Sequence, residues 1–308
     1  MLADTRGTII VSSMGWVDGG NLWIFRTSSG NATTARLSDA KYLSLHAGDG
    51  GHFSVAHHTE SSRIAVTVHH LSQPETVLGS AIVDDDANRV IGGAEVWERV
   101  PSCYTTFYAG PSLRDYVLVR VLAREGRVDL QTFDWFTSDA YDRAYQGIVS
   151  AVQVPGQDVV LVSVQRSSRV IVHDPIAGRE AGAFDIGDRR GNPTLYFRRN
   201  ANELWADDYD AIVKIEPGSW RVLGSRALQP PSGSVSQFIG KFAFDADETM
   251  CAVPRPHSRD VIAIDPGSLQ TRFRCPMLGQ PLEAVALPDR SVVARDWKTG
   301  RLLRGDFR

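Results

Sequence analysis

The sequence predicts an all-β protein: one β-propeller domain over residues 1–308, with seven four-stranded blades expected and six as the alternative. Three observations support this prediction. A short phrase recurs along the chain, in which a run of β-branched residues is followed by an acidic residue and a turn. The phrase returns at a spacing that suits a blade of four strands. Helical periodicity is nearly absent, since only residues 138–145 form a short and weakly amphipathic stretch.

The recurring phrase is clearest in the second half of the chain, at Val170–Pro175, Ile212–Gly218 and Val261–Gly267. Aligning earlier segments on it adds Ala81–Asp85 and, more weakly, Gln131–Asp134. The acidic markers follow one another at steps of 49, 40, 42 and 49 residues and are Asp85, Asp134, Asp174, Glu216 and Asp265. A strand-rich repeat of this length is typical of propeller blades.

The best-defined blade is expected from Asn192 to Gly233. Turn residues separate four extended segments there, including the Asn-rich turn at 199–202 and a tight turn at 216–219. The four strands are expected at 194–197, 204–207, 211–215 and 221–228. Antiparallel strands joined by short hairpins make one blade, and neighbouring blades bury each other's faces.

The same strand order is expected on both sides of this blade. From the N-terminus the strands are expected at 8–12, 21–27, 32–37 and 41–46; 51–59, 63–70, 76–83 and 90–97; 104–109, 116–122 and 128–133; 148–154, 159–164, 169–172 and 181–186; 238–244, 250–253, 261–264 and 271–275; and 282–287, 291–295 and 301–304. The final group lacks its fourth strand. Residues 2–6 are expected to supply it, which would remove an exposed sheet edge.

Composition excludes several classes of protein. The chain has 308 residues, 43% of them hydrophobic, and a formal net charge of −3, so no field of one sign would draw the whole molecule to nucleic acid or anionic lipid. It has no run of about 18 apolar residues for a membrane helix and no secretion signal at residues 1–7. The odd set of cysteines, Cys103, Cys251 and Cys275, favours buried free thiols. A cytoplasmic protein without nucleic-acid or membrane partners is expected.

Histidines are concentrated in one segment, since six of the eight lie between residues 46 and 70. With the expected strands, His46, His52, His69 and His70 share one rim of a blade. Neutral imidazoles that converge can bind zinc or a similar ion, and one can act as a general base. Their spacing matches no standard metal motif, and the alternative is that they pack in and beside strands. No cofactor is predicted; a divalent metal at these histidines is the weaker alternative.

Loops of the other blades are expected to meet at the same rim and to form a polar mouth. The candidate ligand-binding residues there are Arg189, Arg190, Asp207, Asp208, His257, Asp296 and Trp297, together with the four histidines. Charges that orient a ligand and rings that stack on it suit a polar binding site, although solvated loops share this composition. The acidic run at 207–210 could hold calcium, but a solvated turn is favoured. Arg198 and Arg199 are expected at a solvated hairpin tip on the other face.

The runs of Ile or Val followed by Asp-Pro or Glu-Pro-Gly-Ser resemble the YVTN-type, quinoprotein-dehydrogenase-like seven-bladed propellers. The resemblance covers almost the whole chain. That superfamily includes bacterial lactonase-like propellers and repeat proteins of no known activity. The regular Gly-His and Trp-Asp dipeptides of WD40 repeats are absent, as are the Gly-x-Ser-x-Gly, Cys-x-x-Cys and His-Glu-x-x-His motifs. The resemblance therefore assigns no role to any single residue.

Two functions remain open at this point. The first is a non-catalytic propeller that binds a protein partner or a small polar ligand on one face, because strong repeats occur here without a catalytic motif. The alternative is a small-molecule enzyme, a lactonase-like hydrolase, lyase or isomerase, with its active site at the mouth of the central channel. In that enzyme the four rim histidines would act as ligands or bases, and Arg189 and Arg190 would hold an anionic group.

Overall fold

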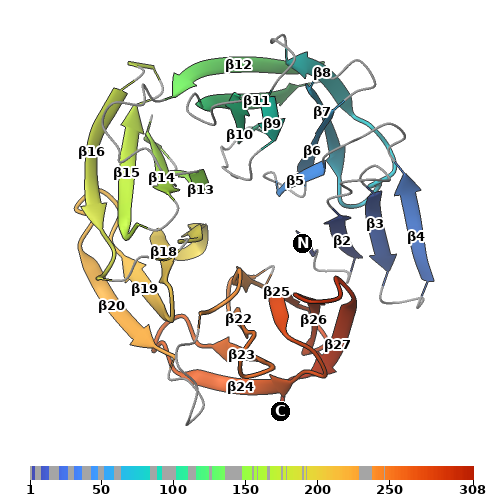
Figure 1. Ribbon diagram of the computed structural model, residues 1–308, viewed down its shortest axis with the longest axis vertical. Coiled ribbons are helices and arrows are strands. Elements are labelled where there is room, and N and C mark those ends of the chain that lie inside the picture. Colours follow the sequence, from blue (N-terminus) through green and yellow to red (C-terminus); the bar gives the residue numbers. More distant parts are fainter. Residues whose placement is uncertain are drawn as a thin grey trace. The chain divides into compact units, whose positions relative to one another are not determined.

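The structure of the protein is a computed structural model in which every named element but one is a β-strand (Figure 1). The exception in the described part of the chain is a 3₁₀ turn at Arg199–Ala201. The structure describes residues 2–3, 8–13, 21–26, 31–36, 43–47, 52–58, 64–83, 89–91, 102–109, 116–124, 127–135, 148–154, 156–157, 159–164, 167–174, 176–177, 179–188, 191, 193–228, 238–245 and 247–308. Before residue 150, side chains are described only for residues 24, 53–55 and 65–82. The all-β prediction is confirmed.

The chain divides into two compact units. Residues 1–9 and 186–308 form one unit, and residues 10–185 form the other. The expectation of a single domain over residues 1–308 stays a prediction. No helix among the described residues has the length and the apolar character that a membrane crossing needs.

The unit of residues 10–185 contains antiparallel sheets that follow one another along the chain (Figure 1). One sheet has β5 (Leu43–Ala47), β6 (His52–His58), β7 (Ile64–His70) and β8 (Gly79–Val83); the next has β9 (Arg89–Ile91), β10 (Ser102–Ala109), β11 (Tyr116–Arg124) and β12 (Arg127–Trp135); the third has β13 (Ile148–Gln153), β14 (Val160–Val164), β15 (Arg169–Asp174) and β16 (Arg179–Asp185). A further sheet pairs β1 (Leu2–Ala3), β2 (Thr8–Ser13), β3 (Asn21–Arg26) and β4 (Asn31–Arg36) in that order.

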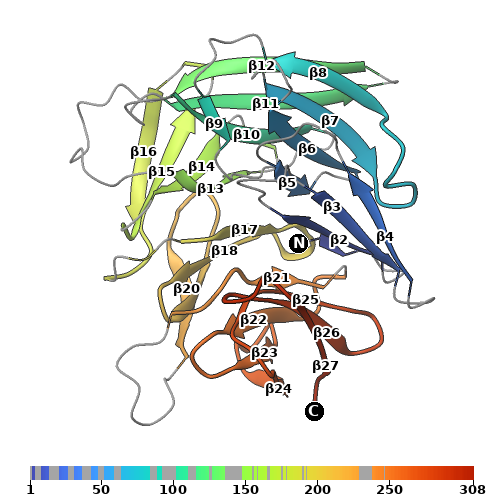
Figure 2. The same cartoon turned by 45° about the vertical axis from the view of Figure 1, so that its right-hand side comes forward.

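The unit that contains residues 186–308 has three sheets, and Figure 2 shows β17 and β21, which open two of them. The first has β17 (Leu195–Arg198), β18 (Glu203–Asp208), β19 (Ala211–Ile215) and β20 (Val222–Ala227); the second has β21 (Ala243–Phe244), β22 (Cys251–Arg255), β23 (Asp260–Ile264) and β24 (Thr271–Pro276); the third has β25 (Pro281–Ala286), β26 (Ser291–Asp296) and β27 (Leu302–Asp306).

Burial explains the recurring phrase. Its β-branched run forms the third strand of a sheet in β15, β19 and β23, and all five residues of β23 are buried. The fourth strands β16 and β20 are mostly exposed. A strand that is covered on both faces has an unbroken run of apolar residues. The third strand of a blade is therefore the easiest strand to recognise in the sequence.

Neighbouring sheets bury each other's faces. Trp205 of β18 is fully buried and meets Phe244 of β21 edge to face, with ring centroids 5.0 Å apart. The core around this pair joins sheet β17–β20 to sheet β21–β24. A second core, which includes Cys275 and Ala284, joins sheet β21–β24 to sheet β25–β27. Antiparallel sheets packed face to face in chain order are the blades of a β-propeller, so that part of the fold prediction is confirmed.

The predicted number of blades, seven or alternatively six, is wrong. Five sheets are described as packed blades, with buried apolar side chains in at least two neighbouring strands, and these are β5–β8, β13–β16, β17–β20, β21–β24 and β25–β27. The sheets β1–β4 and β9–β12 are described by their backbone, apart from the side chain of Ile24. Among the described residues the last blade has three strands. Of residues 2–6, which were expected to complete it, Leu2–Ala3 pairs with β2 and residues 4–6 lie outside the described residues.

The five acidic markers do not occupy equivalent places in their sheets, so their spacing does not give the number of blades. Asp174, Glu216 and Asp265 end or follow third strands, whereas Asp85 comes after β8 and Asp134 lies in β12, and both of those are fourth strands. The two early copies of the phrase are therefore shifted by one strand. The strands expected to open these blades are second strands, β6 and β10. A distance between non-equivalent positions does not count blades.

Two of the three cysteines are described with their side chains. Cys251 and Cys275 are buried free thiols, as the odd cysteine count predicts. Burial raises the pKa of both thiols, so each is a packing group rather than a nucleophile. Cys103 lies in β10, and its side chain is outside the described residues.

Candidate binding site

Three hairpins that follow second strands lie at the same edge of their sheets. They join β18 to β19, β22 to β23 and β26 to β27, and they contain Tyr209, His257 and Trp297. Because antiparallel strands reverse at each hairpin, a segment that enters a first strand lies at this edge as well, and Phe238, ahead of β21, is in such a segment. We call Tyr209, Phe238, His257 and Trp297 the aromatic rim.

The side chains of the aromatic rim contact one another. The Phe238 ring meets those of His257 and Trp297 edge to face, each with centroids 5.1 Å apart and interplanar angles of 88° and 89°. Tyr209 lies 6.4 Å from Phe238, and His257 lies 6.4 Å from Trp297. Aromatic pairs favour edge-to-face packing, so residues from three sheets form one defined cluster here.

Apolar surface is exposed both on the aromatic rim and in the connection next to it. The side chain of Trp297 is 49% exposed, and Leu278, in the connection from β24 to β25, is 99% exposed. Two backbone hydrogen bonds tie this connection to the rim: Met277 N–H donates to Arg259 O, and Trp297 N–H donates to Gln280 O, both at 2.7 Å. Leu278 therefore adjoins the hairpins of the aromatic rim.

Asp296 holds the hairpin that presents Trp297. Its Oδ1 accepts a hydrogen bond from the Gln280 N–H at 2.6 Å, and its Oδ2 accepts bonds from the N–H and the hydroxyl of Thr299 at 2.9 and 2.6 Å. The Thr299 and Gln280 donors lower the pKa of Asp296. Asp296 was a candidate ligand-binding residue, and the structure shows its carboxylate buried among these loop contacts.

Asp207 and Asp208 end β18, directly before Tyr209, and both are buried. The Thr194 N–H donates to Asp207 Oδ1 at 2.5 Å, yet burial raises the pKa of Asp207 to about 7. A side chain at Gly187 would collide with the carboxylate of Asp208, so glycine allows the close approach there. The expected solvated turn at this place is wrong, because both carboxylates are buried.

A buried ion network closes the hairpin that presents His257. Asp260 is fully buried and accepts hydrogen bonds from Arg255 Nε at 2.9 Å and Nη2 at 2.6 Å, and it also pairs with Arg274 Nε. A two-point contact between guanidinium and carboxylate fixes both groups in orientation. His257 itself is exposed at the tip of this hairpin.

The four candidate histidines lie at one edge of sheet β5–β8. His46 is the next-to-last residue of β5, His52 begins β6, and His69 and His70 end β7. In the strand register His52 pairs with His70. Hairpins that follow first and third strands lie at this edge, whereas the hairpins of the aromatic rim follow second strands. The structure therefore gives these histidines and the aromatic rim different edges of their sheets. The histidines belong to the unit of residues 10–185 and the aromatic rim to the unit that contains residues 186–308, so the shared rim stays a prediction.

His69 is a packed histidine. It is buried and stacks on Phe53 with ring centroids 5.0 Å apart. Its Nδ1 donates to the carbonyl oxygen of Pro74 at 2.9 Å, and its Nε2 lies 2.9 Å from the hydroxyl of Thr67. The neighbouring His70 Nδ1 lies 2.7 Å from the Ser72 hydroxyl. Both side chains are engaged in local contacts.

Other parts of the predicted site lie outside the described residues, namely Arg189, Arg190 and the side chains of His46 and His52. In the part of the chain that was searched, no three His, Cys, Asp or Glu side chains group as a metal site would require. Anion binding by the two arginines and metal binding by the histidines stay predictions.

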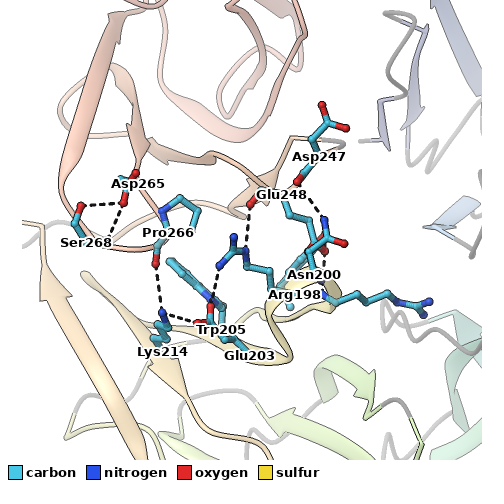
Figure 3. A network of polar contacts seen from close by, with 12 residues as sticks. Arg198, Asn200, Glu203, Trp205, Lys214, Asp247, Glu248, Asp265, Pro266 and Ser268 are labelled. Atoms are coloured by element: carbon cyan, nitrogen blue, oxygen red, sulfur yellow. Dashed lines mark hydrogen bonds and ion pairs between the residues drawn. The ribbon is translucent and has the colours of Figure 1, made fainter.

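Polar contacts around Glu248 join the opposite edge of sheet β17–β20 to sheet β21–β24 (Figure 3). We call this set the latch, and its residues are Tyr196, Arg198, Arg199, Asn200 and Glu248. Glu248, between β21 and β22, accepts hydrogen bonds from the N–H groups of Arg199 and Asn200 at 3.1 and 2.9 Å and from the Tyr196 hydroxyl at 3.3 Å. Arg198 Nε donates to the Glu248 carbonyl oxygen at 3.1 Å. The expected solvated tip at Arg198 and Arg199 is wrong, because the next sheet covers it.

Sequence reasoning missed Phe238, Tyr209 and Leu278. Charged residues and histidines were preferred as candidates, and Phe238 was assigned to a strand at 238–244, whereas β21 begins at Ala243. The available signal was a large apolar side chain in a connection between strands, where burial in a sheet does not account for it.

Comparisons with known proteins agree with the fold. No family model matches the chain, and no curated protein matches it. Among solved structures, the β-propeller domain of Cps50 (Swd1) from Myceliophteria thermophila has a TM-score of 0.68 at 15% identity, covering 98% of this chain and 95% of that one. A chain of the mitotic checkpoint complex has a TM-score of 0.67 at 12% identity, covering 99% and 85%. The periplasmic gluconolactonase PpgL of Pseudomonas aeruginosa has a TM-score of 0.59 at 16% identity, covering 97% and 94%.

These likenesses establish the β-propeller fold alone, because propellers of one fold carry many functions. They support the coarse part of the resemblance seen in the sequence. They do not single out the YVTN-type group within the fold.

Proposed function

We propose that this protein is a binding protein that docks a protein partner on the aromatic rim. One observation carries the proposal: side chains from three sheets meet at one edge, with Trp297 and Leu278 exposed beside them. Protein interfaces concentrate their binding energy in a few aromatic anchors near the centre. Trp297 at 49% exposure has apolar surface that a partner would bury.

The arrangement of the rings supports a protein partner over a small polar ligand. Phe238 contacts both His257 and Trp297 at 5.1 Å, so the rings fill the space between them. A partner would therefore rest on the cluster rather than enter it, as a protein surface does. The hydrogen bonds of Asp296 and the ion network of Asp260 hold two of the hairpins in place before binding, which limits the entropy lost on association. One similar solved structure is a protein assembly, the mitotic checkpoint complex.

The test begins with a photo-crosslinking amino acid at Trp297, used in an extract of the source cells, with the same group at Leu223 as the control. Leu223 is also an exposed apolar residue, at 44%, and it lies on β20 away from the rim hairpins. A protein crosslinked at Trp297 alone is identified, purified and titrated against the full chain. Trp297→Ala is expected to weaken its binding by about tenfold or more, and Leu223→Ala to leave it unchanged. Equal effects of the two variants would contradict the proposal.

The enzymatic alternative, a lactonase-like hydrolase, lyase or isomerase, is supported by likeness in fold to a gluconolactonase. It is tested separately, by assaying ring-opening of simple sugar lactones with the purified chain and with a His52→Ala, His70→Ala double variant. Turnover that the double variant loses would establish the enzyme. Trp297→Ala serves as the control variant, because the aromatic rim and these histidines lie at different sheet edges.

A further inference from the structure

Within the described part of the chain, the last sheet ends on β27 without the fourth strand found in the other sheets. Sheet β25–β27 has three strands, while sheets β17–β20 and β21–β24 of the same unit have four. We propose that the free edge of β27 is the docking site of an acidic, extended segment of a partner protein, which pairs with it as a fourth strand. This site is distinct from the aromatic rim.

The register shows which backbone groups of β27 point away from β26. The Phe307 N–H donates to Arg290 O at 3.1 Å, and the Asp296 N–H donates to Arg301 O at 2.8 Å. These two bonds mark hydrogen-bonded pairs at both ends of β27. Hydrogen-bonded and open pairs alternate in an antiparallel ladder. The N–H and C=O groups of residues 302, 304 and 306 therefore point outward, and no backbone partner for them is found among the described residues.

The continuation of this edge already pairs with another strand. Arg308 and Arg274 of β24 exchange both backbone hydrogen bonds, each at 3.1 Å. Two residues back, Asp306 would face Pro276, which has no N–H to donate. Arg274 and Arg308 are the one β24–β27 residue pair whose backbone bonds are found among the described residues, and Pro276 cannot donate the next one. The rest of the β27 edge has no strand beside it in the described part of the chain. Of residues 2–6, which were expected to fill it, Leu2–Ala3 belongs to the sheet of β2, and residues 4–6 lie outside the described residues.

Charge indicates the chemistry of the partner. The exposed arginines on and beside the outer strands β24 and β27 are Arg272, Arg274, Arg290, Arg301, Arg304 and Arg308. Three of them pair with Asp265, Asp260 and Asp289. No ion pair of Arg290, Arg301 or Arg308 is found within the described residues. Backbone pairing along an edge supplies affinity for any extended peptide, and the flanking charge selects among peptides, so this edge selects an acidic one.

The experiment measures binding of a fluorescein-labelled strand-forming peptide, alternating glutamate with valine, to the full chain by anisotropy. A peptide with lysine in place of glutamate is the charge control. Arg304→Pro removes an outward N–H without breaking a backbone bond to β26. Arg304→Ala keeps that N–H and removes the guanidinium with its contacts to Asp289 and Ser291. We expect Arg304→Pro to weaken binding by about tenfold, Arg304→Ala to weaken it less, and the lysine peptide not to bind. Arg221→Ala, which removes an exposed arginine on another sheet, is expected to have no effect.

Three results would overturn the proposal. The first is glutamate-peptide binding that survives Arg304→Pro or that the lysine peptide matches. The second is slow amide hydrogen exchange at Arg304 and Asp306 in the free monomer, which would show that the chain itself already covers the edge. The third is a dimer in sedimentation that Arg304→Pro dissociates, which would make a second copy the occupant. Trp297→Ala is the independent control. It removes a side chain of the aromatic rim and should leave binding of the glutamate peptide to β27 unchanged.

Discussion

Asp207 is a residue whose environment sets a measurable property of the molecule. Burial raises its pKa to about 7, from 3.8 in an exposed chain, against the hydrogen bond from the Thr194 N–H. Between these two values the folded state binds more protons than the unfolded chain, so stability falls as the pH rises from about 4 to 7. The total loss across this window is at most about 4 kcal/mol.

We expect Asp207→Asn to remove this loss, because the amide keeps an oxygen for Thr194 and has no charge to bury. Thermal unfolding at pH 4 and pH 8 checks it: the variant should gain stability over the parent at pH 8 and little at pH 4. The same gain at both pH values would show that packing, and not ionisation, is responsible.

His173, in β15, has the opposite dependence on pH. Burial lowers its pKa to about 4 from 6.5, although the charge of Asp174 and a bond to Arg179 act the other way. The unfolded chain then binds the proton first, so stability is lost as the pH falls from about 6.5 to 4. His173→Gln should reduce the loss between pH 7.5 and pH 5 by about 2 kcal/mol. Urea unfolding at these pH values measures it, and an unchanged loss would contradict the assignment.

At the scale of elements, the latch around Glu248 fastens the β17–β18 hairpin to the next sheet. Its buried carboxylate accepts hydrogen bonds from the N–H groups of Arg199 and Asn200 in the turn. Arg198 also pairs with Glu203, whose pKa stays below its ordinary value despite burial because Lys214, Trp205 and Arg198 donate to it. The latch thus joins two sheets through polar contacts at the edge opposite the aromatic rim (Figure 3).

Glu248→Ala should cost about 2 to 3 kcal/mol, because it leaves two backbone N–H groups without their acceptor. Glu248→Gln keeps an acceptor oxygen and should cost less. Amide hydrogen exchange adds a local readout: Arg199 and Asn200 should exchange faster in Glu248→Ala, while amides of the distant β26 keep their rates. Exchange that is unchanged at the hairpin would mean that the latch contributes nothing there.

At the scale of the whole molecule, the sequence predicted the blades well and their count badly. Apart from the strand expected at 238–244, of which only Ala243–Phe244 is observed, strand positions from residue 148 onward fall within a few residues of the observed ones. Third strands such as β19 and β23 are easily located because they are apolar runs bounded by turns. The exposed edge strands have no such signature, so Asp85 and Asp134 were aligned with the wrong strand. Two members of the aromatic rim, His257 and Trp297, were among the candidates from the sequence, and their role in binding stays a prediction. Their contact with Phe238 depends on the packing of three sheets, which no local pattern encodes.

The single-domain prediction leads to a last experiment on the whole chain. Asp207 lies in the unit with residues 186–308, and His173 lies in the unit of residues 10–185. Blades of a propeller bury their faces against neighbours, so the chain should unfold in one cooperative step. Calorimetry should then show one unfolding transition. Asp207→Asn should raise its midpoint temperature at pH 8, and His173→Gln should reduce the fall of that temperature between pH 7.5 and pH 5. Two transitions, each responding to one variant only, would show that the units unfold separately and that the chain is not one domain.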